Sequence, residues 1–64
     1  MNSYEAAVAR EVGKLLDEEL RRLTEDLIEG AAKDYADYQF RIGQIRMLQQ
    51  MQQWLHDIER EMRS

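Results

Sequence analysis

Residues 30–34 read Gly30-Ala31-Ala32-Lys33-Asp34 and form the only plausible turn in a chain of 64 residues. On either side of them, apolar residues recur at steps of three and four over a long stretch, which is the periodicity of an amphipathic helix. Gly30 is well placed to end the first helix, and Asp34 is well placed to cap the second. A connection this short predicts two antiparallel helices that lie side by side.

The first helix is predicted over about residues 4–29. Asn2 is a good N-cap residue, and Glu5 follows it by three positions, as in a capping box. A single apolar stripe runs along this helix, interrupted by Gly13. Its members are Val8, Val12, Leu15, Leu16, Leu20, Leu23 and Leu27.

The second helix is predicted over about residues 35–62 and carries two apolar seams. The first seam consists of Tyr35, Tyr38, Ile42, Ile45, Leu48, Leu55 and Met62. The second seam consists of Phe40, Met47, Met51, Trp54 and Ile58, which fall within about 60° of one another on a helical wheel. A single partner helix covers only one of these seams. We therefore expect either a bundle of more than two helices or another protein on the second seam.

The predicted fold is all-α: one domain over residues 1–64, built as an antiparallel two-helix hairpin and packed into a larger helical assembly or oligomer. A domain of this size rarely gains more than about 3–5 kcal/mol from its own core, so it usually adds disulfides, a metal or a partner. The chain has no cysteine and one histidine, which leaves association. A second possibility is that the helices open at Gly30 into one continuous rod.

The sequence gives little support for catalysis. Ser3 and Ser64 lie at the chain ends, and Thr24 and His56 fall on different predicted helices. A surface histidine is the simpler interpretation of His56, because its acidic neighbour Asp57 points in another direction on a helix. We predict no catalytic residue, no cofactor, no metal ligand and no small-molecule substrate.

The charge distribution also limits the partners. Nine Lys and Arg residues against thirteen Asp and Glu residues give a net charge of −4. The excess of acid lies in residues 1–30, and residues 31–64 are balanced. Nucleic acid is an unlikely partner on this basis, because the phosphate backbone requires clustered Lys and Arg. No apolar run approaches the roughly 20 residues that cross a bilayer, and the N-terminus has no secretory signal, so neither a membrane nor secretion is predicted.

Some single residues carry more specific expectations. Gly43 lies inside the second helix, and we expect close packing of the first helix there, with a kink or simple tolerance of the glycine as the alternatives. Tyr35 and Tyr38 begin the same helix, where their rings are expected to close the end of the core. Glu19 and Gln52 lie near the apolar stripes; they either fix the register of the helices or extend to the edge of the interface.

The second seam is the clearest functional signal. Methionine is adaptable and tryptophan is a favoured interface anchor, so we predict a protein interface at Phe40, Met47, Met51, Trp54 and Ile58. Two interpretations stay open. The seam is either the core of a bundle that the chain forms with itself or a surface for a different protein.

The second half of the chain resembles small, acidic, helical proteins of tailed bacteriophages that are encoded among head and tail genes. The resemblance covers about residues 20–55 and rests on Asp34-Tyr35-Ala36-Asp37-Tyr38, followed by Arg41, Gly43, Ile45 and Leu48. It carries no assigned active site. It implies a small virion or assembly protein.

From the seams, the size and this resemblance we expect a non-enzymatic structural or assembly protein of a phage virion. It would dock through its second helix on a larger capsid, portal or tail oligomer, in the virion or in the cytoplasm of the bacterial host. The alternative is a homodimeric four-helix bundle that acts as a regulatory module or as an inhibitor of a host protein.

Overall fold

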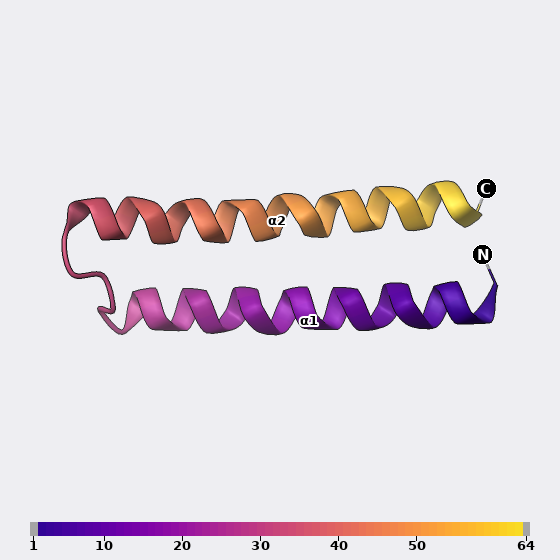
Figure 1. The fold of residues 1–64 in the computed structure, drawn as a ribbon, viewed down its shortest axis with the longest axis horizontal. Helices are drawn as coiled ribbons and strands as arrows, with labels where there is room; N and C mark the ends of the chain where they lie inside the picture. Colours follow the sequence, from indigo (N-terminus) through magenta and orange to yellow (C-terminus); the bar gives the residue numbers. More distant parts are fainter. Residues whose placement is uncertain (1, 64) are drawn as a thin grey trace.

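The computed structural model describes residues 2–63, which form two helices and no strand. Helix α1 spans Ser3–Ile28 and helix α2 spans Tyr35–Arg63. They lie side by side and antiparallel, so that the start of α1 and the end of α2 share one end of an elongated molecule of 46 × 16 × 11 Å (Figure 1). The prediction of an all-α helical hairpin is confirmed.

Helix α1 begins at a side-chain cap. The backbone N–H of Glu5 donates to Oδ1 of Asn2 at 2.8 Å, and Nδ2 of Asn2 donates to Oε1 of Glu5 at 3.3 Å. These bonds satisfy one of the N–H groups that the first helical turn leaves without a partner. The predicted cap at Asn2 and Glu5 is therefore present.

Helix α1 ends at a glycine in the left-handed region of backbone conformation. Gly30 has φ of 85°, and its N–H donates to the Leu27 carbonyl at 3.1 Å. The next N–H, of Ala31, donates back to the Asp26 carbonyl at 3.0 Å. This pair of bonds is the Schellman motif, which turns the chain out of the helix axis and favours the hairpin over a continuous rod.

Gly30 should respond to substitution in the opposite direction from Gly43. Gly30→Ala is expected to destabilise the chain by about 1–2 kcal/mol, because an L side chain is strained at positive φ. Gly43→Ala should stabilise it by about 1 kcal/mol through helix propensity, since an added Cβ at Gly43 meets nothing within 4 Å. Thermal unfolding followed by circular dichroism measures both. Changes of the same sign would contradict the assignment of Gly30 as the helix stop.

Helix α2 begins at a second cap. The N–H of Asp37 donates to Oδ1 of Asp34 at 2.8 Å, as predicted for Asp34. Asp37 Oδ2 accepts from the backbone N–H of Lys33 at 3.0 Å and from Nε of Arg41 at 3.2 Å. The bond from Lys33, followed by the bond from Arg41, holds the pKa of the Asp37 carboxyl below its ordinary value of 3.8. Asp37 therefore ties the turn to the first turns of α2.

This arrangement predicts a pH-dependent contribution from Asp37. Because its folded-state pKa is lowered, the stabilisation is fully present above the ordinary value and is lost as the pH falls through the folded value. Asp37→Asn should lower the melting temperature at about pH 7 and leave it nearly unchanged at about pH 2, where the carboxyl is protonated in both states. A difference of the same size at both pH values would show that the charge is not involved.

The helices meet along a narrow line of small and aliphatic residues. In α1 this line continues the spacing of three and four from its leucines toward the N-terminus, and in α2 it includes one glutamine. Its members are Ala6, Ala9, Gly13, Leu16, Leu20, Leu23 and Leu27 in α1, and Ile42, Ile45, Leu48, Gln52 and Leu55 in α2. Among residues 2–63 only Leu16, at 9% exposure, counts as buried. The hairpin alone therefore has a thin core.

The prediction of one apolar stripe on α1 is wrong for its first half. Val8, Val12 and Leu15 are between 41% and 56% exposed. The reason is helical phase. Three residues before Leu16 lies Gly13, and four residues before Gly13 lies Ala9, and these small residues occupy the interface. A Cβ added to Gly13 would lie 3.4 Å from Cδ2 of Leu55, so α2 passes close to α1 at Gly13.

Two expectations about close packing in α2 are also wrong. Gly43 is exposed and meets nothing, because it points away from α1; the close approach is at Gly13. Tyr35 is 75% exposed and does not close the core. Its ring instead stacks on that of Tyr38 with centroids 6.4 Å apart, and its hydroxyl accepts from Nε2 of Gln39 at 2.9 Å. The tyrosines pack on each other at the surface of the first turn of α2.

Candidate protein-interaction surface

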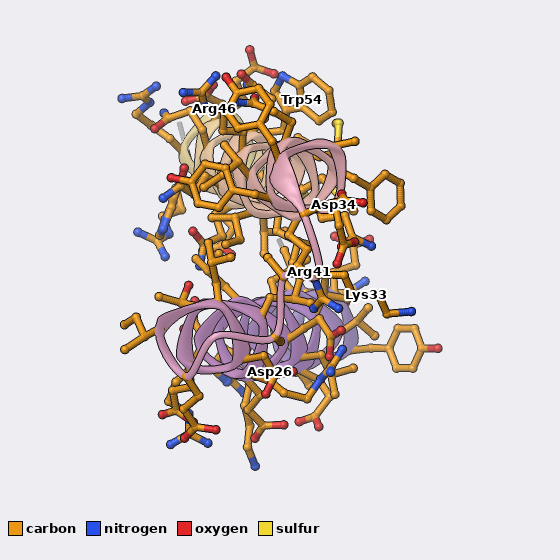
Figure 2. All side chains as sticks on the ribbon, turned by 90° about the vertical axis from the view of Figure 1, so that its left-hand side faces the viewer. Asp26, Lys33, Asp34, Arg41, Arg46 and Trp54 are labelled. Carbon is orange, nitrogen blue, oxygen red and sulfur yellow. The ribbon has the colours of Figure 1, made fainter. Side chains whose placement is uncertain are left out.

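The second seam of α2 is exposed along its whole length. Its five residues, from Phe40 to Ile58, are between 39% and 65% exposed. Figure 2 shows Trp54 on the part of α2 that is turned away from α1. The hairpin therefore leaves the predicted interface residues uncovered. Large apolar side chains in a continuous group on a small domain are typical of a binding surface.

Helix α1 adds a second exposed group on the same side of the molecule. Glu19 and Leu23 of α1 and Gln44, Met47 and Leu48 of α2 line one groove between the helices. Residues four and seven positions apart share a helical face. Leu15 and Val12 precede Glu19 by four and seven residues, and Met51 and Trp54 follow Met47 by the same steps.

We call the combined surface the apolar side. Its members are Tyr4, Val8, Val12 and Leu15 of α1 together with Phe40, Met47, Met51, Trp54 and Ile58 of α2. With about 200 Å² for a large apolar side chain and about half of each exposed, this surface presents on the order of 900 Å². That area exceeds the patches of a few hundred Å² that soluble monomers usually leave exposed.

The part of α1 nearest the turn is charged on this side. Arg22 pairs with Glu19 and, through Nη1, with Asp26 at 3.4 Å. The hydrogen bond from Arg22 lowers the pKa of Glu19, and the same bond raises the pKa of Arg22. Glu19 is thus held by its own helix and does not set the register. The charged group bounds the α1 part of the apolar side toward the turn.

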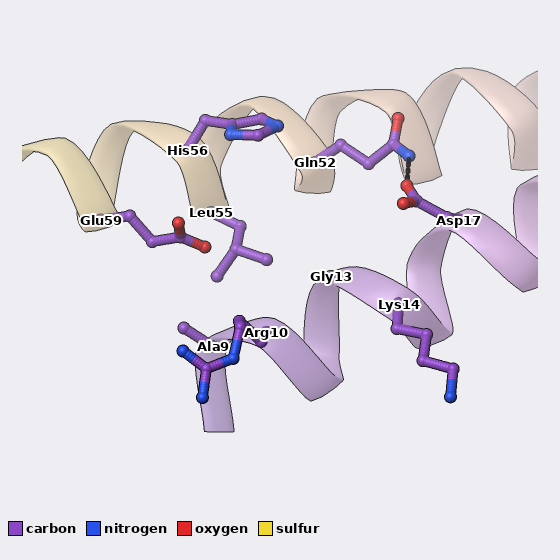
Figure 3. A pocket seen from close by; sticks show the side chains of 9 residues that line it. All are labelled: Ala9, Arg10, Gly13, Lys14, Asp17, Gln52, Leu55, His56 and Glu59. Carbon is purple, nitrogen blue, oxygen red and sulfur yellow. Dashed lines mark hydrogen bonds between the residues drawn. The ribbon is translucent and has the colours of Figure 1, made fainter. Parts of the chain in front are cut away.

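On the side of the hairpin opposite the apolar side, a groove of about 360 Å³ runs between the helices (Figure 3). We call it the polar groove, because most of the side chains that line it are charged or polar. Gly13 and Leu55 lie in it, with charged and polar side chains around them. Its lining consists of Ala9, Arg10, Gly13, Lys14, Asp17, Gln52, Leu55, His56 and Glu59. Gln52 Nε2 donates to Oδ1 of Asp17 at 2.5 Å across the helices, so Gln52 is placed to fix their register.

Thr24 and His56, which fall on different helices, are not brought together. His56 lines the polar groove, and Thr24 donates to the Leu20 carbonyl of its own helix at 2.8 Å, nearer the turn. Among residues 2–63, no group of three His, Cys, Asp or Glu side chains is placed to hold a metal ion.

The sequence identified the α2 part of the apolar side and missed the α1 part. Helical spacing alone puts Val8, Val12 and Leu15 on one stripe with the leucines that follow them. The signal that locates them correctly is the run of leucines from Leu16 to Leu27, because its spacing fixes which face of α1 meets α2.

Within residues 2–63, neither helix is long and apolar enough to cross a bilayer. Comparison with protein-family models, with curated proteins and with solved structures finds no match to this chain.

Proposed function

We propose that this protein is a non-enzymatic interaction module that acts through its apolar side. The observation that carries the proposal is the combination of a thin core with on the order of 900 Å² of exposed apolar side chains. A domain in which Leu16 alone is buried among residues 2–63 gains little from folding by itself. Association with protein supplies the missing burial of apolar surface.

The specific role that we propose is assembly of a bacteriophage particle, by docking on a larger capsid, portal or tail oligomer. Support comes from the resemblance of residues 34–48 to small helical proteins of phage head and tail gene clusters. Exposed apolar seams on long helices also suit the symmetric surfaces of such oligomers, which repeat one docking site many times.

Quantitative mass spectrometry of gradient-purified particles from the phage that encodes the chain tests this role. We expect the chain at a fixed ratio to the major structural proteins, retained through a second gradient. Loss of the chain from particles that carry Trp54→Glu, with retention of Gln53→Glu, would tie incorporation to the apolar side. Absence of the native chain from the particles would lead us to abandon the virion role.

A second candidate is a regulatory module or an inhibitor that binds a host protein. The acidic first helix favours it, since eight acids and four bases fall within residues 1–30. Such a surface suits a basic partner, including a nucleic-acid-binding protein that it would block. Binding to a purified host partner that weakens steeply as salt is raised would favour this candidate over a particle role.

A further inference from the structure

In the half of the molecule away from the turn, the apolar side lies at matching heights on the two helices. Gly13 faces Leu55, and Asp17 bonds to Gln52, which fixes the antiparallel register. Counting from Asp17 and Gln52 in opposite directions places Leu15 level with Trp54. The same count places Val12 level with Asp57, next to Ile58. In the half of the molecule away from the turn, each helix therefore offers apolar side chains at the heights where the other helix does, whereas Met47 and Phe40 lie level with Arg22 and Glu29.

We propose that a second copy of this chain covers the apolar side and that the two hairpins form a four-helix bundle. The two-fold axis runs along the long axis of the hairpin. It sets α1 of one copy across from α2 of the other, and these helices run antiparallel. Leu15 and Val12 of each copy then meet Trp54 and Ile58 of its partner. This inference rests on the proposed function as an interaction module, and it makes the dimer the unit that enters a larger assembly.

The exposed area agrees with this occupant. A stable interface buries about 800 Å² on each partner, and the apolar side presents on the order of 900 Å². In the half away from the turn, the matching heights make the surface complementary to itself, as a two-fold interface requires.

The rest of the hairpin explains why association should stop at two copies. The polar groove with Arg10, Lys14 and His56 lies on the opposite side of the molecule. A two-fold interface that uses one side of each copy is closed, because the apolar side of each copy is covered by that of the other. Glu19, Arg22 and Asp26 form a charged group on α1 between Leu15 and the turn.

The first test is the molar mass of the purified chain by light scattering after size-exclusion chromatography, over a range of concentrations. We expect twice the chain mass of 7.7 kDa. Val12→Glu should raise the dimer dissociation constant by roughly 30-fold or more, as for a residue at the centre of an interface. Ala7→Glu is the matched control, since it adds the same charge to an exposed position five residues earlier on α1 and should leave the dimer intact.

The outcomes separate the possible occupants. A chain that stays monomeric at every concentration overturns the dimer but leaves docking on a phage particle open, because particle mass spectrometry measures that independently. A dimer that Val12→Glu does not weaken overturns the part played by α1 and leaves an interface of α2 alone.

The second test measures the arrangement without disturbing the interface. The chain has no cysteine, so Ala31→Cys at the exposed turn gives a single site for a spin label. With the axis along the hairpin the two turns share one end of the bundle, and the label distance should be about half the 46 Å length or less. A distance near the full length would place the turns at opposite ends and overturn the proposed axis.

Discussion

Leu16→Ala should remove about 2–3 kcal/mol from the free energy of unfolding, which is half or more of what a domain of this size possesses. Leu16 is the buried side chain of the described residues and lies on the line where α1 meets α2. The lower part of the range for leucine truncation applies, because the space left behind in a thin core opens readily to water. Urea unfolding followed by circular dichroism, at one fixed and low protein concentration, gives the value.

Leu15→Ala is the matched control for this prediction. Leu15 is the neighbouring leucine, 56% exposed on the apolar side. Its truncation should cost well under about 1 kcal/mol in the isolated hairpin, because a half-exposed side chain has little burial to lose. Its effect should instead appear in the concentration dependence of unfolding, since association adds stability by mass action. Equal losses for the two leucines at every concentration would contradict the division between core and apolar side.

Trp54→Glu should abolish most of the association while helix content is largely kept. Trp54 lies on the outer part of α2, so a charge there meets water in the hairpin and an apolar surface in the assembly (Figure 2). An interface tryptophan is commonly worth 2 kcal/mol or more. Sedimentation velocity measures association, and circular dichroism at a matched concentration measures helix content.

Leu55→Glu is the comparison that makes this prediction specific. Leu55 is adjacent to Trp54 but faces Gly13 of α1, where a carboxylate would be forced into the contact between the helices. We expect loss of helix content as well as loss of association. If Trp54→Glu lost helix content as completely as Leu55→Glu, Trp54 would belong to the hairpin core.

The turn and its caps could be predicted because each depends on a few neighbouring residues. The positive φ at position 30 favours a glycine there, and the Asp34 side chain accepts from the N–H three residues later. The second seam could be predicted because its residues share one face of α2 whichever face meets α1. These features are decided within one helix or within one turn.

The features that failed depend on how the two helices face each other. Val8, Val12 and Leu15 have helical spacing, yet the partner helix selects the face that carries Ala9 and Gly13. Gly13 and Gly43 both lie inside a predicted helix, so the sequence does not distinguish them. Only the packing of the helices shows that Gly13 lies close to Leu55 and that a Cβ added at Gly43 would contact no other atom within 4 Å. The pairing of the tyrosines likewise follows from their position beyond the last residues of α1.

The short turn and the thin core have a consequence for how newly made chains behave. A loop of this length closes in tens of nanoseconds, and helices of this size form within about a microsecond, so the hairpin is complete almost at once. Encounter between two proteins at micromolar concentration takes on the order of seconds at typical association rates. Each new chain therefore spends nearly all of its maturation as a finished hairpin with its apolar side facing water. In that interval its exposed apolar surface favours chaperone binding and mispairing. The rate of synthesis sets the concentration of chains, and that concentration, rather than the rate of folding, sets how long the interval lasts.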